Sequence, residues 1–114
     1  MISRGEVWMV NLDPTIGQEL KKTRPAVVVS SNSIGKLPLK IIVPITDWKA
    51  PYAGYPWMIY LEPDKQSGLT KRSSADTFQV RSVDQMRLVK KLGQLPEPVM
   101  EEIAAGVAIC IEYR

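Results

Sequence analysis

The chain has 114 residues and a mass of 12.8 kDa, so we expect residues 1–114 to form one domain around one hydrophobic core. It contains no histidine and one cysteine, Cys110, which excludes Ser-His-Asp and Cys-His catalysis, an internal disulfide and nearly every His-ligated metal site. The net charge of +3 favours an anionic partner. No apolar run approaches the roughly 20 residues of a membrane helix and the N-terminus lacks a signal-peptide pattern, which predicts a cytoplasmic protein that does not bind membranes.

Apolar patterning predicts short strands over most of the chain. Residues 6–12 alternate in polarity and stop at Asp13 and Pro14. Residues 25–31 are β-branched and continuously apolar, which is typical of a strand buried on both faces. Residues 39–46 form the next predicted strand, and Pro44 inside it favours an edge position or a bulge. Three shorter strands are predicted at residues 57–61, 74–80 and 88–92.

The C-terminal segment, residues 96–113, changes to a helical period. Apolar residues recur there at every fourth position: Val99, Ile103, Val107 and Ile111. Residues 82–85 match a capping box, which predicts a short helical turn. Together the elements predict a mainly β protein, a small and strongly bent sheet or barrel with a C-terminal α-helix packed on it.

The segment before the buried strand combines one acid with three cations: Glu19, Lys21, Lys22 and Arg24. Arg24 would stand at the mouth of a rigid sheet, where its planar guanidinium can hold two phosphate oxygens. Lys21 and Lys22 would add positive charge for binding nucleic acid. The alternative is a solvated charged loop without a ligand.

Thr46 and Trp48 lie where the strand at residues 39–46 ends. A threonine hydroxyl at this position can donate a hydrogen bond to a phosphate oxygen. The face of Trp48 offers a stacking surface for a base, a contact that contributes roughly 1–3 kcal/mol. The alternative is an ordinary polar residue at a strand end beside a half-buried aromatic side chain.

A third polar segment surrounds the strand predicted at residues 74–80. Lys71 and Arg72 precede it and Arg81 follows it, while Asp76 and Gln79 could read base edges or orient a nucleophile. The alternative is a charged turn that leads into a half-exposed strand. The residues alone therefore indicate a basic, mostly β domain with cation-bearing loops, for which the best generic partner is a nucleic acid.

Three sequence blocks occur in order along the chain. The opening block comprises GEVW at residues 5–8, DPTIGQE at residues 13–19 and RPAVV at residues 24–28. The second block ends in PIT at residues 44–46, and the third is QVRSV at residues 79–83. These blocks resemble the signatures of the MazF/PemK/Kid family of toxin endoribonucleases, and the resemblance covers nearly the whole chain.

The resemblance implies an SH3-like β-barrel, an obligate homodimer, and sequence-specific cleavage of single-stranded RNA without a metal or other cofactor. It also implies inhibition by a cognate MazE-like antitoxin whose acidic tail occupies the RNA groove. Arg24 and Thr46 match the catalytic Arg and Thr of the family. Glu19 matches an acid often found beside them, and Gln79 falls on a position that lines the RNA groove in relatives.

The implied reaction is attack of the ribose 2′-hydroxyl on the adjacent phosphorus, which leaves a 2′,3′-cyclic phosphate and a 5′-hydroxyl. Arg24 would stabilise the charge on the phosphoryl oxygens, because its pKa is too high for a general base. Thr46 would donate to the phosphate or orient the 2′-hydroxyl. The missing histidine leaves the general base unassigned, and Glu19, the nearest carboxylate in the motif, is one candidate.

Two features depart from the family pattern. Phe78 stands where many relatives have Asp or Glu, and the chain lacks the histidine that some members use in the first loop. The alternative function is therefore a non-catalytic binding module on the same barrel, either a gyrase-poison-like toxin or a decayed homologue that only binds its antitoxin. The pair of Arg24 and Thr46 discriminates between these functions, because a gyrase-binding module would not need it.

Overall fold

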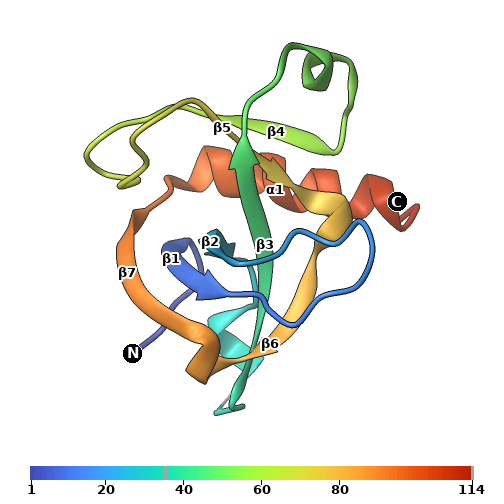
Figure 1. Ribbon diagram of the computed structural model, residues 1–114. Coiled ribbons are helices and arrows are strands. Elements are labelled where there is room, and N and C mark those ends of the chain that lie inside the picture. The colour runs from blue at the N-terminus through green and yellow to red at the C-terminus, as the bar shows by residue number, and fades with distance from the viewer. Residues whose placement is uncertain (35, 114) are drawn as a thin grey trace.

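The structure is a computed structural model that describes residues 1–34 and 36–113 (Figure 1). This part of the chain forms seven strands: β1 (Glu6–Asn11), β2 (Thr23–Val28), β3 (Leu39–Asp47), β4 (Met58–Leu61), β5 (Ser73–Asp76), β6 (Arg81–Asp84) and β7 (Leu88–Gln94). One α-helix, α1 (Glu97–Cys110), follows them. Four short 3₁₀ turns lie between strands: η1 (Asn32–Ile34), η2 (Ala50–Gly54), η3 (Thr77–Gln79) and η4 (Gln85–Arg87). The prediction of a mainly β protein with a C-terminal helix is confirmed.

The strands pair antiparallel in one bent sheet of order β4-β5-β3-β2-β1-β7, with β6 also paired to β3. The long strand β3 runs through the centre and is joined by β5 along one half and by β6 along the other (Figure 1). In the described residues no pairing joins β4 to β7. The sheet therefore curls in the way the predicted barrel does, but strand pairing does not close it.

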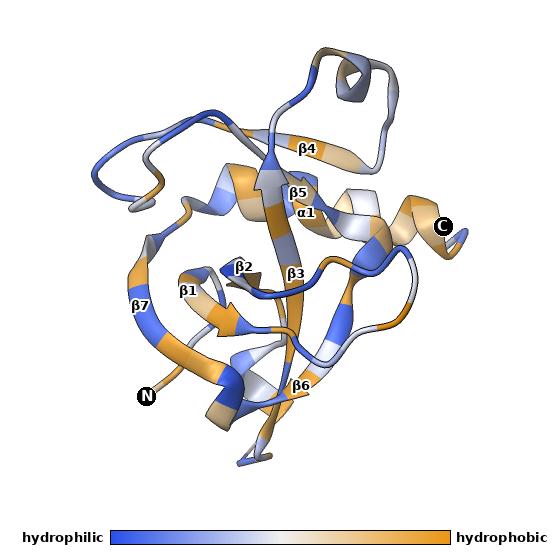
Figure 2. Cartoon of the chain, in the orientation of Figure 1, coloured by the Kyte–Doolittle hydropathy of each residue, from blue (hydrophilic) through white to orange (hydrophobic). Residues whose placement is uncertain are grey.

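Apolar side chains cover both faces of the central strands and form two clusters. One cluster lies between the sheet and α1 and includes Val27, Val43 and Ile103. The other lies on the opposite face and includes Ala26 and Val28. Consecutive residues of β2 thus enter opposite clusters, which confirms the predicted strand buried on both faces. Figure 2 shows hydrophobic stretches along β3 and β4 and a hydrophilic loop between β4 and β5.

Helix α1 begins after Pro96 and presents Met100 and Ile103 to the sheet. Gly106 lies against the buried Thr77 of η3, where an added Cβ would come within 2.9 Å of the threonine side chain. Of the predicted apolar stripe, Ile111 follows the helix and is exposed. No helix in the described ranges has the length and apolarity needed to cross a membrane.

Two local predictions are wrong. The strand predicted at residues 74–80 ends at Asp76, because the Asp76 carboxylate accepts a hydrogen bond from Phe78 N and starts the turn η3. The capping box predicted at residues 82–85 does not form, because residues 82–84 belong to β6; the predicted helical turn is η4, which begins at Gln85 with Asp84 as its N-cap, accepting from Met86 N. In both places an aspartate caps the turn, and in the second it takes the role predicted for Ser82.

Pro44 of β3 lies opposite the gap between β5 and β6, which the turn η3 creates. The Ile41 carbonyl accepts from Val29 N, so strand alternation directs the Pro44 nitrogen to the opposite edge of β3. That edge pairs with β5 from Ile45 onward and with β6 up to Ile42, and neither described ladder includes Pro44. The predicted edge position is wrong because β3 is a central strand, and the described β3 ladders show no register shift at Pro44. The missing N–H is accommodated instead by the gap between the ladders to β5 and β6.

Candidate active site

The register of the sheet places polar side chains in one row across four strands. Tyr60 of β4 lies opposite Ser74 of β5, and Ser74 lies opposite Thr46 of β3. Residues directly opposite in antiparallel strands share a face of the sheet. The pairing of β2 with β3 ends at Ala26 and Pro44. Arg24 and Thr46 each lie two residues beyond that pair, so they occupy equivalent positions on the same face where the two strands part.

Arg24 is held at this position by two interactions. Its backbone pairs with Val10 of β1, and its Nε donates to the Lys21 carbonyl at 2.9 Å. The side chain is half-buried, and among the described residues its terminal guanidinium nitrogens have no hydrogen-bond partner, so they can contact a ligand. Thr46 is also half-buried. The strand register therefore gives Arg24 and Thr46 equivalent positions where β2 and β3 part.

A hollow of about 360 Å³ reaches the row only through Pro44, two residues before Thr46 in β3, and neither Arg24 nor Thr46 is among the residues that line it. Its walls are the loop before β2 and the turn η3 with the start of β6, and Pro44 belongs to its lining. Three predicted site residues line it: Glu19, Gln79 and Arg81. Glu19 is exposed, and one of its carboxylate oxygens accepts from Ile16 N. The hollow therefore brings an exposed carboxylate, an amide and a cation to one place.

Gln79 joins the two walls of the hollow. Its Oε1 accepts from Leu20 N at 2.6 Å, and its Nε2 donates to the Gln18 carbonyl at 3.4 Å and to Asp76 Oδ2 at 3.3 Å. Burial raises the pKa of the Asp76 carboxyl above its ordinary value, although hydrogen bonds from Phe78 N and Gln79 oppose the shift. Asp76 and Gln79 thus fix the shape of the site and connect residues 59 apart in sequence.

The remaining predicted cations lie on two sides of the row. Arg72 Nε donates to the Tyr60 hydroxyl at 3.2 Å, and its guanidinium carbon lies 5.5 Å from the centre of the Tyr60 ring. Lys71 forms an exposed ion pair with Asp47 at 3.1 Å. Trp48 packs edge-on against Tyr60 with ring centres 5.0 Å apart. These three predicted residues therefore surround the β4 end of the row.

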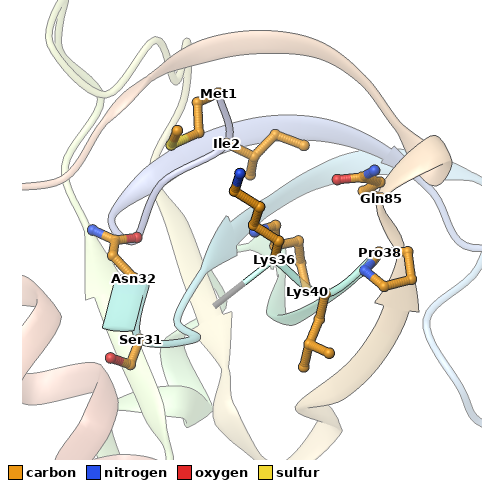
Figure 3. A pocket seen from close by; sticks show the side chains of 9 residues that line it. Met1, Ile2, Ser31, Asn32, Lys36, Pro38, Lys40 and Gln85 are labelled. Carbon is orange, nitrogen blue, oxygen red and sulfur yellow. The ribbon is translucent and has the colours of Figure 1, made fainter. Parts of the chain in front are cut away.

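Lys21 and Lys22 are exposed in the loop before β2 and are not among the residues that line the hollow. Lys22 adopts a positive φ of 69°, and its N donates to the Asp13 carboxylate. They contribute charge near Arg24 rather than a defined contact. A larger hollow of about 610 Å³ lies at the other end of β3, beside Lys36, Lys40 and Gln85, and contains none of the predicted site residues (Figure 3).

Two members of the row, Tyr60 and Ser74, were not among the predicted site residues. Ser74 is fully buried, and its hydroxyl has no hydrogen-bond partner in the structure. The alternation within each predicted strand shows which residues share a face of that strand. Only the pairing of β4, β5 and β3 shows that Tyr60 and Ser74 lie on the same face of the sheet as Thr46. Within residues 1–34 and 36–113, no three Asp, Glu or Cys side chains gather in a way that would hold a metal ion.

Comparison with known proteins identifies relatives over nearly the whole chain. A family model described as PemK-like, MazF-like toxin of type II toxin-antitoxin system matches residues 3–111. The chain is 34% identical to Endoribonuclease MazF9 of Mycobacterium tuberculosis over 118 residues, which cover 98% of each chain. It is 31% identical to Endoribonuclease PemK of Escherichia coli over 107 residues, 90% of this chain and 76% of that one.

Solved structures share the fold. MazF from Deinococcus radiodurans superimposes with a TM-score of 0.77 at 23% identity, covering 98% of this chain and 96% of that one. A mycobacterial endoribonuclease in complex with its cognate antitoxin superimposes with a TM-score of 0.77 at 17% identity, covering 100% of this chain and 98% of that one. The bent sheet with one C-terminal helix is thus the MazF fold.

Proposed function

Because this chain belongs to the family of PemK-like, MazF-like toxins of type II toxin-antitoxin systems and is homologous to curated endoribonucleases, we propose that it cleaves single-stranded RNA at specific sequences without a metal ion. The observation that carries the proposal is the placement of Arg24 and Thr46 at equivalent positions on one face, where β2 and β3 part. A guanidinium and a hydroxyl in this arrangement can hold two oxygens of one phosphate.

In the proposed reaction the 2′-hydroxyl oxygen bonds to the adjacent phosphorus, and the bond from phosphorus to the 5′-oxygen breaks. The 2′ proton passes to a base, and the leaving 5′-oxygen takes up a proton. The products are a 2′,3′-cyclic phosphate and a 5′-hydroxyl. Because the nucleophile belongs to the substrate, the protein must supply in-line placement and charge stabilisation, and DNA cannot react.

The described geometry supports a role for each residue. Arg24 would stabilise the charge that grows on the phosphoryl oxygens, since its Nε is already held by the Lys21 carbonyl and its terminal nitrogens have no hydrogen-bond partner in the described part of the chain. Thr46 would donate to the same phosphate or orient the 2′-hydroxyl. Glu19 is the exposed carboxylate of the adjoining hollow and the proposed general base. Gln79 and Arg81 in that hollow, with Lys71, Arg72 and Trp48 across the row, would bind the flanking nucleotides.

We also propose that the chain acts as a homodimer in the cytoplasm and is inhibited by a MazE-like antitoxin. Ile109, Ile111 and Tyr113 are exposed at the end of α1, and β4 is an edge of the sheet, which supports an interface there. The positive net charge supports an acidic partner for the RNA-binding face. MazE–MazF complexes from Deinococcus radiodurans are among the similar structures, which supports the same kind of partner for this chain.

The test compares single-turnover RNA cleavage by the wild type with that by Arg24→Ala and Thr46→Val. Loss of one preorganised donor typically lowers the rate about 10²–10³-fold, and both variants should retain the melting temperature of the wild type within a few degrees. Lys90→Ala, which removes an exposed cation from β7, is the matched control and should cleave at the wild-type rate. A folded Arg24→Ala protein with wild-type activity would refute the assignment and favour a binding-only module.

A further inference from the structure

Six of the eight aromatic residues of the chain form one connected group, which we call the aromatic series: Trp48, Tyr52, Tyr55, Trp57, Tyr60 and Phe78. Neighbouring ring centres lie 5.0–6.4 Å apart. The series starts at Trp48, two residues after Thr46, and ends at Phe78, which lines the same hollow as Glu19 and Arg81. It therefore runs from the proposed catalytic pair to the wall of the adjoining hollow.

The exposed end of the series is held rigidly. Phe78 is 68% exposed, while its neighbours are tied into the protein. Thr77 is buried and its Oγ1 donates to the Trp57 carbonyl at 2.7 Å, and Gln79 Oε1 accepts from Leu20 N. Phe78 N donates to Asp76. Phe78 is thus presented to solvent on a preorganised turn, and little ordering would be required when a ligand covers it.

The aromatic rings do not simply form a small core beneath the loop after β3, because two of them, Tyr55 and Phe78, are exposed. Tyr55 and Trp57 stack with their planes 3° apart and their centres 5.0 Å apart, yet Tyr55 is 41% exposed. Aromatic rings that served only as a small core would be buried, because burial is the source of their stabilisation. An exposed pair of parallel rings beside an exposed phenylalanine instead leaves flat π surfaces available to a ligand.

Cations accompany the series at both ends. Arg72 lies against Tyr60, and Arg81 lines the hollow that Phe78 borders. Aromatic faces flanked by cations are the usual means of binding single-stranded nucleic acid, in which the cations hold phosphates and each base stacks on a ring. An apolar peptide would need a groove without flanking charge, so the arrangement favours bases.

We propose that Phe78 and the stacked pair of Tyr55 and Trp57 form a stacking platform for bases that flank the cleaved bond. The proposal rests on the proposed RNA cleavage for its biological meaning. The platform contributes to RNA binding and leaves the chemical step to Arg24 and Thr46. Loss of Phe78 should therefore raise KM and leave kcat unchanged.

The experiment measures the dissociation constant of a mixed-sequence single-stranded RNA with 2′-O-methyl riboses, which cannot react, by fluorescence anisotropy. Phe78→Ala and Phe78→Leu should both weaken binding about 5- to 150-fold, the range for one stacked base, and Phe78→Trp should restore it. The leucine variant keeps an apolar side chain and lacks only the π face. Val89→Ala, which alters a residue of similar exposure on β7, is the control and should bind as the wild type does.

Each further outcome separates this proposal from the proposed function. Wild-type affinity in Phe78→Leu, or equal affinity in all variants, overturns the platform even if the wild type cleaves RNA. Conversely, if the wild type cleaves no RNA but its RNA binding depends on Phe78, the platform is upheld and the proposed RNA cleavage is refuted. If light scattering shows that Phe78→Ala loses its affinity together with the oligomeric state of the wild type, Phe78 belongs to a protein interface and the platform is overturned.

Discussion

Replacing Gly106 with alanine should destabilise the protein, although alanine is the better helix former. In an exposed helix the change would stabilise by about 1 kcal/mol. Here the new Cβ would lie 2.9 Å from both Cγ2 and Oγ1 of Thr77, closer than real side chains approach. Thr77 cannot rotate away freely, because it is fully buried and its Oγ1 donates to the Trp57 carbonyl.

The magnitude follows from these opposing contributions. Overpacking of a well-filled site costs about 1–3 kcal/mol, and loss of the Thr77 hydrogen bond adds about 1 kcal/mol. With the gain in helix propensity subtracted, the free energy of unfolding should fall by about 1–3 kcal/mol, which lowers the melting temperature by roughly 4–12 °C for a domain of this size. Thermal unfolding followed by circular dichroism measures the shift.

Two controls separate the contact from the helix. Gly54→Ala adds a Cβ that meets nothing within 4 Å and should leave the melting temperature close to that of the wild type. In a Thr77→Ala background Gly106→Ala should no longer destabilise, which gives a coupling energy of about 1–3 kcal/mol in the double-mutant cycle. A Gly106→Ala protein that melts about 4 °C above the wild type would show that the contact relaxes at no cost and would refute the reasoning.

Three further predictions concern single side chains. Gln79→Ala should expose residues 13–22 to limited proteolysis while lowering the unfolding free energy by only about 1 kcal/mol. If the protease cuts this loop no faster than in the wild type, the hydrogen bond from Leu20 N to Gln79 does not hold the loop in place. Burial alone would raise the pKa of Glu6, but hydrogen bonds from Ser3 N and Trp8 and the Lys91 ammonium lower it below 4.5. Stability from Glu6 is therefore present above pH 4.5 and lost as the pH falls through the lowered pKa, so Glu6→Gln should flatten the acid limb in urea unfolding. Burial raises the pKa of Asp76, so wild-type stability should decline as the pH rises from 3.8 through the raised value, and Asp76→Asn should abolish that decline in the same titration.

The sequence pattern was sufficient to predict the elements whose burial repeats along the chain, such as β2 and α1. The continuous apolar run of β2 and the four-residue period of α1 both reflect burial that a sequence displays directly. Pro44 marked the break in the sheet because a missing backbone donor must face an unpaired edge. Arg24 and Thr46 were named from their motifs, and the register of β2 and β3 places them at equivalent positions.

The rest of the site depends on contacts between distant segments. The turn η3 forms where a regular strand was predicted, because Asp76 caps it and Thr77 is fixed by the Trp57 carbonyl. Gln79 shapes the hollow through a hydrogen bond to Leu20, which no local pattern encodes. Ser74 acquires its place beside Thr46 only through pairing of β5 with β3. Composition and periodicity carry no information on such pairings.

The most direct test of the central claim is to incubate the purified protein with a long single-stranded RNA transcript in excess EDTA and to map the product ends. The account predicts discrete cuts at a common sequence that carry 2′,3′-cyclic phosphates and 5′-hydroxyls, and their loss in Arg24→Ala. Absence of cuts by folded wild-type protein, or cuts that require added divalent cations, would contradict it.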